Sequence, residues 1–124
     1  MVKLYKSFDI NKNHKESIIL IGNFDGVHLG HQKLFKLAKL YKKKYNLKIG
    51  VVNFDPMPKM FFNKFLKNFR ITSINQKIKL LSKLKVDFII TKKFDKRFSR
   101  TKSINFIKDI LNKKLKSKFI FVSN

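Results

Sequence analysis

The chain has 124 residues, of which 44% are hydrophobic, and its 30 basic residues against seven acidic ones give a formal net charge of +23. This length suits one α/β domain and is too short for two. The absence of cysteine excludes a disulfide framework and a thiolate zinc site. Nothing near the amino terminus resembles a secretory signal, and no stretch approaches the ~18 apolar residues of a membrane span. We therefore expect a cytoplasmic protein with no membrane partner.

The excess of positive charge would suit a nucleic-acid partner, because dense basic surfaces release counterions from phosphate backbones. Only Arg70, Arg97 and Arg100 are arginine, however, and base readout and bidentate phosphate contacts favour arginine over lysine. The lysines are also spread through every segment of the chain. We therefore expect no specific nucleic-acid partner, only weak adhesion that vanishes as salt rises. The composition favours no particular oligomeric state.

Strand and helix patterns alternate in the first half of the chain. The apolar run Ser17–Gly22 predicts a strand buried on both faces. Gln32–Tyr45 predicts a helix that covers a sheet, because apolar residues recur at helical spacing. Its expected inward residues are Leu34, Leu37, Ala38, Tyr41 and Tyr45. Leu47–Phe54 predicts a second strand, which the Asp55–Pro58 stretch ends because proline cannot donate to a strand ladder.

The second half continues the alternation. Ser73–Gln76 has the form of a helix capping box, and Ile74, Ile78 and Leu81 then recur on one face. The further expectations are a strand at Val86–Thr91, a basic loop at Lys92–Lys102, a helix from about Ser103 to Leu115 with Phe106, Ile107, Ile110 and Leu111 inward, and a strand at Lys118–Ser123. The pattern predicts a single α/β domain of Rossmann-like type, with a mainly parallel sheet flanked by helices.

The stretch from Gly22 to His31 lies between the first predicted strand and its helix, which is where ligands bind in such sheets. Gly22 and Gly26 allow the backbone to turn tightly and approach a ligand, and Gly30 keeps the space between His28 and His31 open. His28 and His31 lie three residues apart, so both imidazoles would project from one side of the first helical turn, where anions are favoured. Fixed donors of this kind suit phosphoryl transfer.

Other roles for these residues stay open on the sequence alone. An arbitrary pair of histidines at this spacing is more often an ordinary surface pair. A zinc site would need further ligands, whereas His14 lies in a polar segment and cysteine is absent. Asp25 is as consistent with a turn or cap residue as with a contact to magnesium. The glycines, the buried strand and the amphipathic helix around the pair nevertheless favour phosphate handling.

The run Gly22–His31 is similar to the H-x-G-H signature of the nucleotidyltransferase superfamily. Four further stretches resemble motifs of one family within it, the bacterial bifunctional riboflavin kinase/FAD synthetases. Asn53–Pro58 resembles that family's F-D-P-x-P loop, Arg70–Thr72 with Gln76 and Lys77 its L-T-x-x-x-E-K segment, and Phe94–Phe98 with Asn105–Leu111 its F-D-x-x-F motif and following helix. The motifs occur in the family's order and cover nearly the whole chain.

The resemblance implies adenylyl transfer from ATP, with Mg²⁺ present, to the phosphate of FMN, giving FAD and pyrophosphate. It implies catalytic roles on the phosphates for His28 and His31, and no residue is predicted to ligate a metal ion. The residues implied on the ATP side are Gly22, Asn23, Phe24, Asp25 and Gly30, and those implied on the flavin side are Asp55, Pro56 and Pro58. Phe54 and Met57 are equally consistent with core residues at a strand end.

The chain departs from the family's pattern in four places. Asn53 stands where threonine or an apolar residue is usual, Gln76 replaces a glutamate, and Ser123 stands where a glycine opens the next loop. The later S-S-T-x-x-R segment does not follow. We therefore expect residues 1–124 to form a partial FMN adenylyltransferase domain without the riboflavin kinase domain, as a fragment or as a degenerate remnant. The alternatives are a related nucleotidyltransferase with another acceptor phosphate and a basic, non-catalytic fragment that binds nucleic acid.

Overall fold

The computed structural model describes residues 2–25, 29–56, 58 and 74–123. Within them, five parallel strands form one sheet in the order β1-β4-β3-β2-β5. The bounds are Lys3–Tyr5 for β1, Ile18–Ile21 for β2, Ile49–Asp55 for β3, Phe88–Lys93 for β4 and Phe119–Val122 for β5. Because the strands run in the same direction, their carboxyl ends meet at one edge of the sheet. The prediction of a mainly parallel α/β sheet is confirmed.

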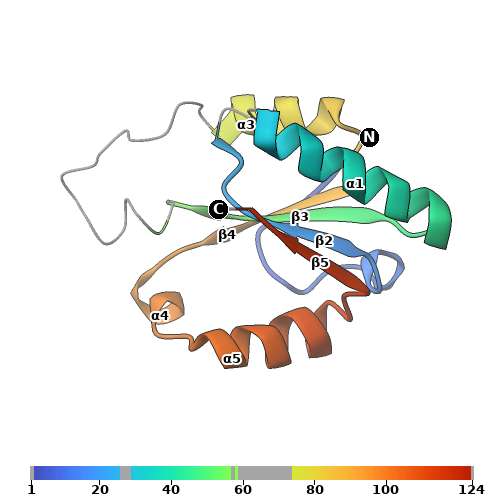
Figure 1. Ribbon diagram of the computed structural model, residues 1–124. Helices are drawn as coiled ribbons and strands as arrows, with labels where there is room; N and C mark the ends of the chain where they lie inside the picture. Colours follow the sequence, from blue (N-terminus) through green and yellow to red (C-terminus); the bar gives the residue numbers. More distant parts are fainter. Residues whose placement is uncertain (1, 26–28, 57, 59–73, 124) are drawn as a thin grey trace.

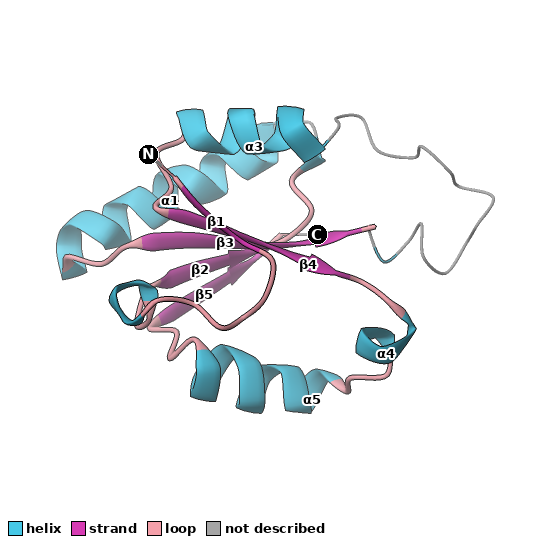
Figure 2. Ribbon diagram, turned by 180° about the vertical axis from the view of Figure 1, so that it is seen from behind, coloured by secondary structure: helices cyan, strands magenta, loops and turns pink. Residues whose placement is uncertain are grey.

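Helices cover both faces of this sheet, as Figures 1 and 2 show. On one face, α1 (Leu29–Tyr45) and α3 (Ile74–Lys83) lie side by side and both start at the carboxyl edge. On the other face lie α4 (Lys96–Ser99) and α5 (Ser103–Asn105), which continues as the π-helix η4 (Phe106–Lys114). The chain thus changes face after β4, and β5 returns to pair with β2. Parallel α/β sheets bind ligands where the order of successive strands reverses its direction across the sheet. Here that point lies between β2 and β5.

The core consists of two layers, because alternate residues of a strand point to opposite faces of the sheet. The layer under α1 and α3, called the α1/α3 layer below, contains Leu20 of β2 and Val51 of β3. The opposite layer, called the α5/η4 layer, contains Ile19 and Val52 of the same strands. These central strands are therefore buried on both faces, as their continuous apolar runs predict.

The predicted helix over residues 32–45 is confirmed, but its buried face is partly different. The helix begins earlier, at Leu29, and its most buried apolar residues are Phe35 and Ala38, at 1% and 0% exposure. Leu37 and Tyr45, which we expected to point inward, are 40% and 47% exposed. The prediction was wrong there because the true stripe runs through His31, Phe35 and Ala38, and these three residues share one face at the 3.6-residue period.

The segment Lys92–Lys102 is not the loop that we predicted. β4 extends to Lys93, and α4 follows because the Asp95 carboxylate accepts a hydrogen bond from the Phe98 amide at 2.8 Å. That bond lowers the pKa of the Asp95 carboxyl below its ordinary value. Further along, Ile107 is 52% exposed instead of inward, because the π-helical winding of η4 departs from the α-helical period that we assumed.

Among the remaining elements, the predicted strands and helices lie within a few residues of their expected bounds, and two short elements were not predicted. β3 ends at Asp55, immediately before Pro56, and Ser73 of the predicted capping box lies outside the described residues. The strand β1 and the 3-10 turn η1 (Lys12–His14) were not predicted. β1 pairs with β4, and His14 of η1 stacks on Phe88 of β4. Because β4 is distant in sequence from both elements, no local pattern marks them.

A buried histidine fastens η1 to the sheet. His14 Nδ1 lies 2.6 Å from the Tyr5 hydroxyl, and the imidazole stacks on Phe88 with ring centroids 4.7 Å apart. Burial lowers the pKa of His14 below 6.5; nearby Lys48 and, more weakly, Lys3 act in the same direction, while Asp87 opposes them. His14 is therefore neutral in the folded protein near neutral pH, and it is buried although the segment around it is polar.

We predict that the protein loses stability as the pH falls below about 6.5. The unfolded chain titrates His14 near that ordinary value, whereas the fold lowers its pKa. Between the two values the unfolded state binds more protons, so the free energy of unfolding decreases with falling pH. Urea unfolding between about pH 7.5 and about pH 5.5 measures this slope. His14→Gln should show a smaller slope, and equal slopes in the two proteins would contradict the assignment.

Candidate phosphate edge and aromatic pocket

The turn after β2 lies at the carboxyl edge, between the ends of three strands. Gly22 N donates to Val52 O at 3.1 Å, and Ser123 N donates to Ile21 O at 2.8 Å. A Cβ on Gly22 would lie 2.9 Å from the Ser123 Cβ and 3.2 Å from Phe24 Cζ. The packing of the strand ends therefore already requires glycine at this position, apart from any ligand.

Phe24 anchors this turn in the core. Its side chain is 1% exposed, and its ring centroid lies 5.3 Å from that of Phe35 and 5.1 Å from that of His31. Its φ of 51° lies in the left-handed region, which costs a residue with a Cβ about 1–2 kcal/mol. Burial of the ring, worth about 1.5–3 kcal/mol, offsets that cost. The Phe24 side chain thus belongs to the α1/α3 layer, and only its backbone remains for the ligand contact that we predicted from the motif.

His31 lies in the first turn of α1 and is 5% exposed, with its ring edge-on to Phe24 at 74°. Side chains in a helix lean toward its amino end, which for α1 is the carboxyl edge of the sheet. The structure therefore brings Gly22, Phe24 and His31 together, and His31 is a buried residue. Asn23 and Asp25 are half-buried in the same turn, Gly30 is the second residue of α1, and Gly26 and His28 lie outside the described residues.

The residues implied on the flavin side lie at the end of the neighbouring strand. Asp55, Pro56 and Pro58 are half-buried, and Asp55 O accepts a hydrogen bond from Phe94 N at 3.1 Å. Asp55 and Pro56 also line a cavity of about 460 Å³, together with Thr91, Lys93 and residues of β1 and α3. These residues therefore lie at the same edge as the turn after β2.

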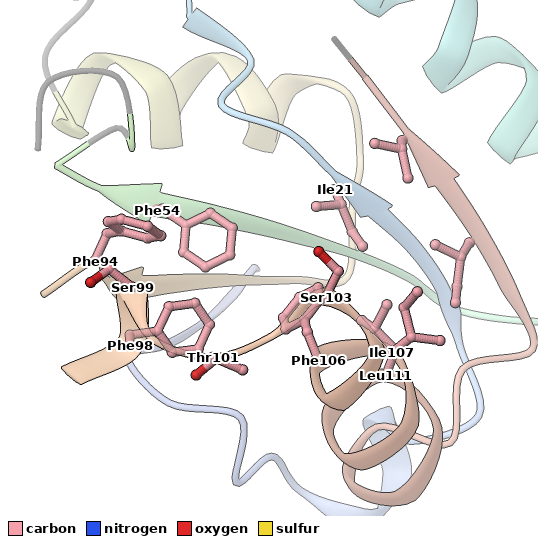
Figure 3. A pocket seen from close by; sticks show the side chains of 12 residues that line it. Ile21, Phe54, Phe94, Phe98, Ser99, Thr101, Ser103, Phe106, Ile107 and Leu111 are labelled. Carbon is pink, nitrogen blue, oxygen red and sulfur yellow. The ribbon is translucent and has the colours of Figure 1, made fainter. Parts of the chain in front are cut away.

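On the opposite face, the structure contains a pocket that the sequence did not single out as a site (Figure 3). Its volume is about 450 Å³, and it lies under the ends of β2, β3 and β5, against α4 and η4. Four phenylalanine rings dominate its wall, namely Phe54, Phe94, Phe98 and Phe106. The centroid of Phe98 lies 5.5 Å from that of Phe54 and 6.2 Å from that of Phe106. We call this cavity the aromatic pocket.

The aromatic pocket suits a flat, mostly apolar ring system. Aromatic rings pack edge-on or offset at such centroid distances, and ligand sites combine an apolar lining with a few polar groups. Here the side chains of Ser99, Thr101 and Ser103 supply hydroxyl groups beside the rings. The signal that could have identified the pocket is the F-D-x-x-F motif, whose two phenylalanines both line it.

No group of three or more His, Cys, Asp or Glu side chains that could hold a metal ion occurs among the described residues. Within the same part of the chain, every helix is too short or too polar to span a bilayer.

Sequence comparisons connect this chain to one enzyme family. A family model described as FAD synthetase matches residues 10–124. The bifunctional riboflavin kinase/FMN adenylyltransferase of Buchnera aphidicola subsp. Schizaphis graminum is 43% identical over 118 residues, which are 94% of this chain and 37% of that protein. The Escherichia coli (strain K12) protein of the same name is 36% identical over 107 residues, 86% of this chain and 34% of that protein. The chain thus spans 34–37% of the length of these two relatives.

Solved structures show the same fold at lower identity. A Streptococcus pneumoniae structure titled as a macrolide-efflux protein aligns over 98% of this chain and 48% of its own, with a TM-score of 0.84 and 24% identity. The pantoate–β-alanine ligase of Francisella tularensis aligns over 81% of this chain and 39% of its own, with a TM-score of 0.55 and 20% identity. At these identities the likeness shows the fold alone.

We predict that Phe24→Ala lowers the free energy of unfolding by about 3–5 kcal/mol, because it leaves a cavity between β2 and α1. Urea unfolding measures the change. Leu40→Ala is the control, since Leu40 is 66% exposed on the outer side of α1, and its effect should stay within about 0.5 kcal/mol. Similar values for the two variants would show that the Phe24 ring does not hold the turn.

Proposed function

Because the chain belongs to the FAD synthetase family, we propose that it takes part in transfer of the adenylyl group of ATP to the phosphate of FMN. The observation that supports this most directly is the position of the aromatic pocket beside the turn after β2. Ile21 lines the pocket, and the next residue, Gly22, begins the turn. A flavin ring in the pocket and a triphosphate at the turn would therefore bind at one edge of the sheet.

On the ATP side, the turn and the start of α1 act on the phosphates. Gly22, Asn23, Phe24, Asp25 and Gly30 form the backbone that approaches ATP, and the imidazoles of His28 and His31 donate to phosphate oxygens. Burial of His31 strengthens such an interaction, because charges act more strongly where water is excluded. Fixed donors stabilise the charge that develops on the transferring phosphoryl group.

The reaction needs no base on the protein. The phosphate monoester of FMN is already ionised at neutral pH, and one of its oxygens attacks the α-phosphorus of ATP. A new phosphorus–oxygen bond forms there, while the bond from the α-phosphorus to the bridging oxygen breaks. Pyrophosphate leaves with the electron pair of that bond, and the product is FAD.

On the flavin side, the aromatic pocket holds the ring system and Asp55, Pro56 and Pro58 flank the path toward the turn. Mg²⁺ would arrive with ATP. Since the described residues offer no cluster of three potential ligands, the phosphate oxygens and water would supply most of its coordination, as is usual for this ion. The ion would neutralise part of the phosphate charge.

We predict that the chain, supplied with ATP, Mg²⁺ and FMN, forms FAD and pyrophosphate, which chromatography and a pyrophosphate assay detect. His31→Asn should lower the rate on the order of a hundredfold, because one donor to the transition state is lost. His14→Gln is the matched control at neutral pH, since His14 precedes β2 at the far end of that strand. Equal turnover of nicotinamide mononucleotide would contradict the proposed acceptor, and an unchanged rate for His31→Asn would contradict the role of His31.

We predict that Phe98→Ala weakens binding of FMN and of riboflavin alike by about tenfold, because ring contacts in the aromatic pocket are lost. Quenching of flavin fluorescence measures both affinities, and calorimetry should find ATP affinity unchanged. Tyr45→Ala, at an exposed ring on the opposite face, is the control. Unchanged flavin affinity in Phe98→Ala would place the flavin outside this pocket.

A further inference from the structure

The ring of Phe98 contacts every other phenylalanine ring in the wall of the aromatic pocket. Its centroid lies 5.5 Å from that of Phe54, 5.8 Å from that of Phe94 and 6.2 Å from that of Phe106. The Lys92 ammonium, which does not line the pocket, lies over the same ring at 5.6 Å from its centroid. The position of Phe98 therefore affects the shape of the whole aromatic wall.

Phe98 lies on an element that has little support of its own. Phe54 belongs to β3, which is paired on both sides, and Phe106 begins the nine-residue η4. Phe98 belongs instead to α4, which has four residues, none of them fully buried (Figure 3). A single helical turn is unstable by itself, because few hydrogen bonds offset the entropy lost in ordering it. Something other than burial must therefore fix the position of α4.

Asp95 supplies the hydrogen bonds that fix this turn. Its Oδ1 accepts from the Phe98 amide at 2.8 Å, and its main-chain carbonyl oxygen accepts from the Ser99 amide at 2.9 Å. The bond to the Phe98 amide lowers the pKa of the Asp95 carboxyl, so the acceptor is ionised at neutral pH. Both amides belong to residues that line the aromatic pocket. Asp95 thus connects the end of β4 to the wall of the pocket.

We propose that Asp95 is a positioning residue for the flavin: by capping α4, its carboxylate holds the Phe98 ring in the wall that receives the flavin ring system. This inference rests on the proposed function, in which the aromatic pocket holds the flavin. Asp95 does not line the pocket, so it acts through Phe98 and not by contact with the flavin. Loss of the cap releases Phe98 and leaves the turn after β2 in place, so flavin binding should weaken and ATP binding should not.

Two substitutions in the 124-residue chain separate the cap from the charge. Asp95→Ala removes the acceptor, so affinity for FMN and for riboflavin should fall about threefold to tenfold, no more than in Phe98→Ala. Asp95→Asn keeps a side-chain oxygen that can cap a helix, so it should retain most of the affinity that Asp95→Ala loses. Flavin fluorescence measures these affinities. Equal losses in the two variants would show that the negative charge is what matters, and would overturn the capping role.

Two further measurements distinguish the positioning of Phe98 from a general loss of stability. The visible absorption band of FMN, which reports the surroundings of its ring system, should shift less in saturated Asp95→Ala than in the saturated wild-type chain. Calorimetry should find the ATP affinity of Asp95→Ala unchanged, and an equal loss of ATP and flavin affinity would overturn the proposal. Asp109→Ala is the matched control, since it removes the same charge from a 55% exposed side chain of η4 and should change none of these values.

Hydrogen exchange tests the same coupling without a substitution. If the cap favours flavin binding, flavin binding must stabilise the cap by the same factor. FMN added to the wild-type chain should therefore slow exchange of the Phe98 amide more than exchange of the Lys116 amide, which donates to Asn112 O at the far end of η4. Equal slowing of the two amides would overturn the role of Asp95, even if Asp95→Ala fails to fold.

The outcomes separate this inference from the proposed function. If the wild-type chain binds FMN and Phe98→Ala weakens that binding while Asp95→Ala does not, the positioning role alone is overturned. If the wild-type chain does not bind FMN, or if Phe98→Ala binds it as tightly as the wild type, the aromatic pocket is not the flavin site. Both the placement of the flavin and the role of Asp95 are then overturned.

Discussion

The contact of the Phe24 ring with Phe35 and His31 determines where the site lies. Because this ring is buried between the turn after β2 and the first turns of α1, the helix begins directly beside the ends of the central strands. The turn cannot move away from the sheet without exposing the ring to water, which the hydrophobic effect opposes. The positions of Gly22 and of the His31 imidazole at the carboxyl edge both follow from this packing.

The pleat of β3 divides the edge into two chemically different faces. Asn53 and Phe54 are neighbours in sequence, yet Asn53 lies with the α1/α3 layer and Phe54 lines the aromatic pocket on the other face. Successive side chains of a strand alternate in this way, so one strand end can serve a polar site and an aromatic site at once. The proposed reaction, which joins a nucleotide to a flavin, would use both environments. A parallel sheet with helices on both faces offers them at one edge.

The central elements could be predicted from the sequence because their signals are local. The apolar runs of β2, β3 and β4 and the glycine-containing turn after β2 mark the sheet and its edge directly. The burial of His31 could not be predicted, because it depends on the ring of Phe24, whose backbone adopts a positive φ that no pattern indicates. The aromatic pocket could not be predicted for a similar reason. Its rings include Phe54, Phe98 and Phe106, which come from three elements that only the crossover after β4 brings together. The basic residues around Phe98 also made α4 resemble a loop, although Asp95 is a typical helix-capping residue.

The large positive charge affects the attraction of ligands to the protein more than the stability of the fold. One carboxylate has a clear structural role, since Asp87 Oδ2 accepts from Lys42 Nζ at 2.9 Å and from Ile49 N at 2.8 Å and so joins α1 to β3. Most lysines of the described residues are exposed, and their field would attract any polyanion, whether a nucleotide or a nucleic acid. Attraction of a polyanion to exposed lysines does not depend on its sequence and is screened by salt.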